Sequence, residues 1–367
     1  MPRASPFAKA FIASLLLTSP PGAILGIAAS SSSTAAQRAI AESVSAALQG
    51  NSRRSREALN AVPAEQFSGE DADYRACMLE RFGGTSPPPS VEDVDDPFVR
   101  ETLAIYQDYW WRALTAPAKR EVLNAKLQRR LSALLEEQAV AWNWDALEKR
   151  LADRMRERGY YSQLGHTPPL RELMIWRKQD SKIHDVALPE GPHQVRVEML
   201  DDFVALGWSA YARCDRGSNG GWVGDDRIYA VMPAFADDLD GDAFRASLLG
   251  HEAQHFADGA RFPGLEAWEL EYRAKLTELW MARQSLPKLL TRLAGSQSDD
   301  KQSPHTFANK RVLNDLRTRL QAQGITPSQA DLSDVPADAL HKAAREQLLE
   351  DSEERQAAVR NAPEKPR

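Results

Sequence analysis

The stretch DGDAFRASLLGHEAQHFADG, residues 240–259, decides the fold of the C-terminal half of this chain. Asp240 and Asp242 precede an apolar run, which is the usual pattern of a helix start. The flanks Leu249-Gly250 and Phe256-Ala257 and the inner pair Ala253-Gln254 are uncharged, as a buried helix requires. The stretch therefore predicts a helix that is buried on most of its faces.

The motif His251-Glu252-Ala253-Gln254-His255 lies inside this predicted helix. Two residues four apart are separated by about 40° around a helix and lie one turn above each other. Both imidazoles can therefore reach one metal ion. Glu252 is rotated by about 100° from His251, so its carboxylate can hold a metal-bound water without becoming a ligand. The bare pattern also occurs by chance, and the uncharged helix around it favours a metal site here.

The segment resembles the zincin metallopeptidases, in which a strand runs above the active-site cleft and the H-E-x-x-H helix lies beneath it. The third histidine of the metzincins does not follow His255. The gluzincin pattern is closer, because its third ligand is a Glu on the next helix, often followed three residues later by a small residue. Glu271-Tyr272-Arg273-Ala274 fits this pattern within a predicted helix over 268–284. The resemblance covers roughly residues 205–285.

The resemblance implies one Zn²⁺ per chain, held by His251, His255 and Glu271. Glu269 and Glu278 remain competitors for the third position, because they lie on the same predicted helix. The sequence departs from the family at Lys275, where many gluzincins carry an Asp that partners a ligand histidine. Asp258, one turn after His255, is the candidate acceptor for a histidine N–H in its place. The alternative is that Asp258 is an ordinary helix-end acid.

The activity that the resemblance implies is zinc-dependent hydrolysis of peptide bonds in a peptide or protein substrate. A zinc-bound water would attack the scissile carbonyl, with Glu252 as general base and then general acid. His305 is the candidate donor to the oxyanion, although it could equally cap the helix that follows it. Three tyrosines are further candidates for this role: Tyr211, Tyr229 and Tyr272.

Two other functions remain open at this point. One is a zinc hydrolase of a non-peptide amide, and the other is a non-catalytic helical binding protein with a structural zinc. Intact Glu252 argues against the second, because a structural site does not need it. The predicted strand at 227–232 could bind an extended peptide as an added edge strand, or it could only complete the sheet.

Residues 1–29 have the pattern of a signal peptide. Arg3 and Lys9 form a basic start, an apolar stretch follows, and small residues gather near Ala28 and Ala29. An uncleaved membrane anchor is the alternative, which two prolines inside the apolar stretch disfavour. We therefore expect an exported protein, periplasmic or secreted, without a stable membrane span after signal removal.

Cys77 and Cys214 are the only cysteines of the chain. An even number of cysteines in an exported protein favours a disulfide, and two buried free thiols are the alternative. This bond would connect the helical N-terminal region to the catalytic domain.

The composition is that of a folded protein, with 43% hydrophobic and 27% charged residues. The net charge of −6 argues against nucleic acid as a partner, because phosphate binding needs a basic face. Helical periodicity over 30–158 predicts a helical N-terminal region, and short β-favouring runs after 159 predict a small mixed sheet. We expect an α+β, mostly α fold with a zincin-like catalytic domain at 159–349 and a disordered tail at 350–367.

Overall fold

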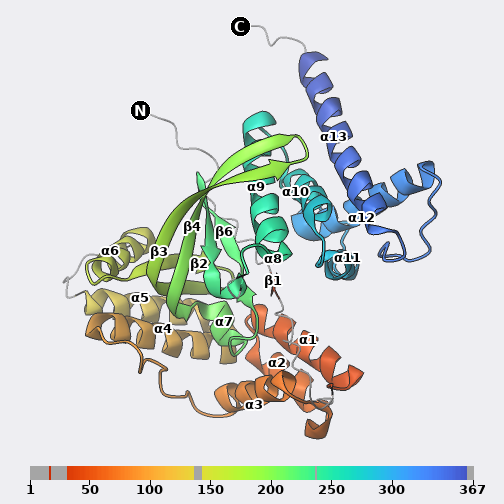
Figure 1. The fold of residues 1–367 in the computed structure, drawn as a ribbon. Coiled ribbons are helices and arrows are strands. Elements are labelled where there is room, and N and C mark those ends of the chain that lie inside the picture. Colours follow the sequence, from red (N-terminus) through yellow and green to blue (C-terminus); the bar gives the residue numbers. More distant parts are fainter. Residues whose placement is uncertain (1–15, 18–30, 136–142, 236–237, 362–367) are drawn as a thin grey trace. The chain divides into compact units, whose positions relative to one another are not determined.

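A computed structural model describes residues 16–17, 31–135, 143–235 and 238–361 (Figure 1). The described chain is mostly helical, with a small mixed sheet of five strands, which confirms the α+β, mostly α class. It forms two compact units. The N-terminal unit comprises residues 16–180 and 200–219, and the C-terminal unit comprises 181–199 and the described residues from 220 onward.

The N-terminal unit is built mainly from helices. They are α1 (Thr34–Leu48), α2 (Ser52–Asn60), α3 (Glu70–Gly83), α4 (Pro97–Thr115), α5 (Arg120–Leu134), α6 (Trp144–Arg156) and α7 (Trp208–Ala212). Strand β2 (Tyr161–Thr167) pairs antiparallel with the first part of β3 (Leu170–Leu188). The short strands β1 (Leu16–Leu17) and β5 (Ser218–Asn219) pair with each other.

Local sequence explains where the longest helix of this unit begins. The side chain of Asp96 accepts hydrogen bonds from the backbone N–H groups of Phe98 and Val99 at the start of α4. Pro97 occupies the first turn, where its missing N–H is not needed. The buried face of α4, including Tyr106 and Trp110, packs into one apolar core with residues from the other helices of the unit.

The predicted disulfide between Cys77 and Cys214 is present, with a Cα–Cα distance of 6.2 Å. Both cysteines belong to the N-terminal unit, so the bond closes a loop inside one compact unit rather than connecting two. The expectation of a link between domains placed Cys214 with the sequence that follows residue 159. The structure instead groups residues 159–180 and 200–219 with the helices.

The C-terminal unit carries the H-E-x-x-H motif. After β6 (Gly221–Val223) and β7 (Arg227–Val231) it is helical, apart from connecting loops. Its helices are α8 (Asp242–Phe244), a π-helical turn at Arg245–Gly250, α9 (His251–Arg261), α10 (Ala267–Met281), α11 (Leu286–Gly295), α12 (Pro304–Ala322) and α13 (Ala337–Asn361). The last four contribute apolar residues to one buried core.

The sheet order is β2-β3-β4-β7-β6, and both β3 and β4 (Gly191–Leu206) have residues in each unit. β7 therefore lies between two strands, and its hydrogen-bonding edges are already occupied by β4 and β6. The expectation that the strand at 227–232 takes a peptide as an added strand is wrong for this reason. The edge on that side of the sheet is the three-residue strand β6.

Helix α10 is the centre of the C-terminal unit and packs against α9, α12 and α13. All nine residues from Glu271 to Leu279 are buried, so the helix has no solvent-facing stripe over this length. Five of these nine are polar: Glu271, Arg273, Lys275, Thr277 and Glu278. Because buried polar groups need partners, α10 organises the polar interior of the unit.

Residues 350–361 differ from the expectation of disorder at 350–367, and residues 362–367 lie outside the described part of the chain. Helix α13 continues to Asn361, because its polar side chains find partners in the unit. Asp351 pairs with Arg273, and Arg355 pairs with Glu269. Compositional polarity alone therefore did not identify a disordered segment.

The expected signal peptide at 1–29 lies outside the described residues, except for Leu16 and Leu17. Among the helices that are described, none combines the length and the apolar character that crossing a membrane requires.

Candidate metal centre

Helix α9 begins at His251, directly after the π-helical turn at 245–250. π-Helical turns are rare and occur often at functional sites. Gly250 lies against Met281 of α10, and a Cβ at this position would overlap the Met281 sulfur. The glycine thus permits the close approach of α9 to α10 that brings ligands from the two helices together.

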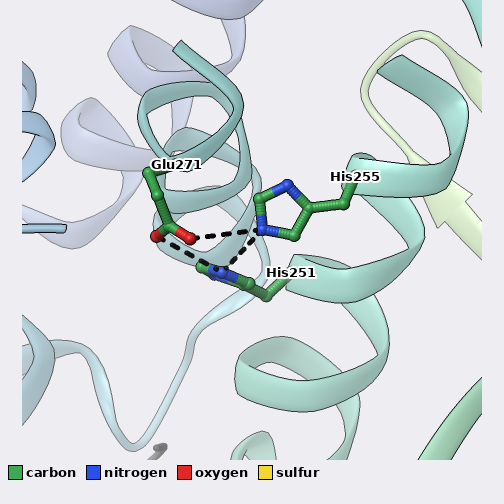
Figure 2. A group of neighbouring side chains, drawn as sticks. All are labelled: His251, His255 and Glu271. Carbon is green, nitrogen blue, oxygen red and sulfur yellow. Dashed lines mark hydrogen bonds and ion pairs between the residues drawn. The ribbon is translucent and has the colours of Figure 1, made fainter. Parts of the chain in front are cut away.

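His251, His255 and Glu271 form a group that could hold a metal ion (Figure 2). The Nε2 atoms of the two histidines are 3.2 Å apart. Oε2 of Glu271 lies 3.7 Å from His251 Nε2, and Oε1 lies 3.5 Å from His255 Nε2. Figure 2 shows the carboxylate of α10 pointing between the two imidazoles of α9. The structure thus brings together the three residues that the sequence indicated as ligands.

Two further side chains contact Glu271. Lys275 Nζ lies 3.2 Å from Glu271 Oε2, and His305 Nδ1 lies 2.7 Å from the same oxygen. Burial would raise the pKa of Glu271, but Lys275 and the neighbouring histidines outweigh burial and hold that pKa well below its usual range. Burial would likewise lower the pKa of His255, yet Glu271 reverses the direction and raises it. Glu271 is therefore an ionised carboxylate, the form that binds metal.

The two competitors for the third ligand position have other roles. Glu269 closes the capping box at the start of α10, where its side chain accepts from the backbone N–H of Glu266. Glu278 lies beside His251, with its Oε2 3.7 Å from Nδ1, the ring nitrogen that is not used in the group. Arg292 binds the other oxygen of Glu278 at 2.7 Å and is the main reason that its pKa falls to about 2 despite burial.

Glu252 is 3% exposed and makes no hydrogen bond or ion pair with any residue that the structure describes. A polar side chain that is buried without a partner is unusual, and such groups occur mainly where function requires them. Glu252 contributes to raising the pKa of the neighbouring His255. Its position beside the ligand group is the one expected from the sequence.

Asp258 does not serve as the acceptor for a ligand histidine that we expected. Its Oδ1 lies 2.9 Å from the Arg273 guanidinium and accepts a hydrogen bond from Gln254 at 2.9 Å. Arg273 is completely buried and also binds Glu190 and Asp351. The physical reason for the difference is that a buried guanidinium needs carboxylate partners, and Asp258 is one of three around it.

The candidate oxyanion donors have different neighbours in the structure. Tyr211 packs against Phe82 and Trp110 in the N-terminal unit, and Tyr229 stacks on Trp222. The hydroxyl of Tyr272 donates to Asp315 on α12. Of the candidates, only His305, in the first turn of α12, contacts the ligand group, and its side chain is 47% exposed. His305 therefore lies next to Glu271, and its role as an oxyanion donor stays a prediction.

Sequence reasoning missed two roles on α10. Lys275 was noticed only as a departure from the family pattern, and Glu278 only as a rival ligand. The signal for Glu278 is its spacing of two helical turns from Glu271, which places both carboxylates on one face of α10. No pattern in the sequence indicates that Lys275 is buried.

We compared the chain with protein-family models, with curated proteins and with solved structures, and none of the three comparisons found a match.

Proposed function

We propose that this chain is a zinc-dependent peptidase of gluzincin type that works outside the cytoplasm. The observation that carries the proposal is the convergence of His251, His255 and Glu271 beside the buried, unpartnered carboxylate of Glu252. Three protein ligands leave one position of a tetrahedral ion open, which is typical of catalytic zinc rather than structural zinc.

The spacing of the ligand atoms supports zinc as the metal. Two atoms that each lie about 2.0–2.1 Å from one ion at the tetrahedral angle are about 3.3 Å apart. The two histidine nitrogens are 3.2 Å apart, which is close to this value, and Oε1 and Oε2 of Glu271 lie 3.5 Å from His255 Nε2 and 3.7 Å from His251 Nε2, respectively. Two imidazoles and one carboxylate are also a ligand set that known zinc hydrolases use. One ligand atom from each of the three residues lies within 4.8 Å of the others, which is compact enough for the side chains to close on one ion.

Each side chain has a distinct part in the proposed reaction. Zinc bound in the group would supply a Lewis acid and lower the pKa of a water. The Glu252 carboxylate accepts a proton from the attacking water and later donates it to the leaving nitrogen. His305 contacts Glu271 through Nδ1, so Nε2 is the atom available to a substrate carbonyl oxygen.

The disulfide supports the proposed location. Disulfides persist in oxidising compartments and are rare in the cytosol of most cells. The bond between Cys77 and Cys214 thus fits the expected export signal, and we propose a periplasmic or secreted protein.

The test is metal content together with hydrolysis, measured on the purified chain. Wild type should contain about one zinc per chain and cleave a mixed peptide library, with products identified by mass spectrometry. Glu252→Gln should keep the metal and lose hydrolysis by at least about 10³-fold, because the proton acceptor is removed. His251→Ala should lose both.

Other outcomes would point elsewhere. Zinc retention with cleavage of non-peptide amides alone would favour the second kind of hydrolase. Zinc retention without any hydrolysis would favour a structural ion. Wild type without stoichiometric metal would contradict the proposal.

A further inference from the structure

Lys275 is a buried lysine inside the proposed metal site. Its side chain is 9% exposed, and its Nζ lies 3.2 Å from Oε2 of Glu271. Lysine is almost never fully buried without a partner, because removal of an ammonium group from water is costly. The burial of Lys275, one helical turn after the proposed third ligand, therefore depends on the negative charges around it.

The surroundings of Lys275 are rich in buried carboxylates. Glu271, in contact with Lys275, is 7% exposed, and Glu278, which also interacts electrostatically with Lys275, is 1% exposed. Arg292 pairs directly with Glu278, whereas the side chains in contact with Glu271 are Lys275 and histidines. Lys275 therefore provides the amino group that faces Glu271 at 3.2 Å.

We infer that Lys275 is a built-in counter-cation for the third metal ligand, which stabilises the metal-free fold and weakens metal binding. The inference rests on the proposed metal site. An ammonium group 3.2 Å from the carboxylate compensates a buried negative charge whose other neighbours in the metal-free chain are histidines.

Lys275 also opposes metal binding. A divalent ion that binds Glu271 competes with the ammonium for one carboxylate and is repelled by it. Lys275 thus weakens the affinity for the metal ion in two ways. It stabilises the metal-free state, and it repels the ion in the metal-bound state. The chain would therefore fold without metal and bind it reversibly afterwards, unlike small metal domains that fold only with their ion.

The experiment compares three substitutions in the full chain, freed of metal by dialysis against a chelator. Lys275→Met removes the charge, Lys275→Arg keeps it, and Lys288→Met removes an exposed charge on α11 as the matched control. For each protein the melting temperature is measured with and without zinc. The zinc dissociation constant is measured by competition with a chromogenic chelator.

We expect Lys275→Met to lower the melting temperature of the metal-free protein and to tighten zinc binding by about tenfold or more. The zinc-induced rise in melting temperature should be larger than in wild type. Lys275→Arg and Lys288→Met should behave like wild type in both measurements. A purely structural role for Lys275 would lower the melting temperature without tightening zinc binding.

A second background separates charge from packing. In Glu271→Gln the carboxylate is absent, so Lys275→Met should lower the melting temperature of the metal-free protein less than it does in wild type. An equal loss in both backgrounds would overturn the inference.

The remaining outcomes are also decisive. If Lys275→Met does not fold without metal, refolding of this variant or of Lys275→Gln on addition of zinc supports the inference, and failure to refold with zinc overturns it. Unchanged or weaker zinc binding by a folded Lys275→Met would likewise overturn it while leaving the proposed function intact. Absence of zinc binding by wild type would instead refute the metal site itself.

Discussion

Oε2 of Glu278 lies 3.7 Å from Nδ1 of His251, while Nε2 of the same ring faces His255 and Glu271. The two nitrogens of one imidazole therefore have different tasks. A carboxylate at Nδ1 favours the tautomer in which Nε2 is free to bind metal and also limits rotation of the ring. Glu278 is itself held by Arg292 on α11.

We predict that Glu278→Gln weakens metal binding by about tenfold or more, because the orienting charge at Nδ1 is lost. Chelator competition measures the change. Glu269→Gln is the matched control on the same helix, since Glu269 caps α10 and lies away from the ligand histidines. Equal metal affinity of wild type and Glu278→Gln would contradict the assigned role.

Arg273 connects three carboxylates from different parts of the C-terminal unit: Glu190, Asp258 and Asp351. We predict that Arg273→Met destabilises the protein by about 3–5 kcal/mol, because buried charges lose their partner. Urea denaturation followed by tryptophan fluorescence provides the measurement. The control Arg311→Met removes an exposed pair with Asp315 and should cost less than about 1 kcal/mol. Similar costs for both variants would show that the cluster around Arg273 does not stabilise the fold.

Glu172 is a buried carboxyl group of the N-terminal unit whose pKa rises to about 7 through burial, although the N–H groups of Trp208 and Leu173 donate to it. Its folded pKa exceeds its unfolded value, so its protonated form favours the fold. Stability is therefore lost as pH rises from about 4.5 to about 7, and the loss then stays constant.

We predict that Glu172→Gln is more stable than wild type at pH 8, by about 3 kcal/mol from the size of this pKa rise. The gain should shrink toward pH 4.5, where wild type keeps the proton. Urea denaturation at several pH values measures it, with exposed Glu101→Gln as the control. A gain that does not depend on pH would mean that Glu172 is not the titrating group.

The disulfide closes a loop with a sequence separation of 137 residues in the N-terminal unit. We predict that the double substitution Cys77→Ser/Cys214→Ser lowers stability by about 2–5 kcal/mol, mainly because the unfolded chain gains freedom. Thermal unfolding of the variant and of reduced wild type should agree. Zinc affinity should be unchanged, because neither cysteine belongs to the ligand group. An unaltered melting temperature would show that the bond does not constrain the unfolded state appreciably.

Helical periodicity was sufficient for part of the candidate site. The spacing of His251 and His255 determines their common face on α9, because the geometry of one helix is local. The apolar patterns likewise predicted the helical class of the fold, and the two cysteines were correctly predicted to pair. The spacing of the two histidines is fixed by one helix, and each cysteine has no other cysteine in the chain with which to pair.

The roles of the acidic residues could not be predicted from helical spacing. Glu269, Glu271 and Glu278 share one helix, and their partners come from α9, α11, α12 and α13. Asp258 was a reasonable partner for a histidine until the fold brought Arg273 against it. Similarly, nothing local to residues 227–232 shows that β6 covers one edge of that strand and β4 the other.

The sequence by itself determined the chemistry that this chain can offer: two histidines one helical turn apart, a glutamate between them and a supply of acids on the next helix. Only the tertiary structure decided which acid faces the histidines, which one lies behind a ring and which lysine is buried among them. The physical reason is that burial makes each charge depend on its nearest partners, and most of these, such as His305 for Glu271, come from other helices.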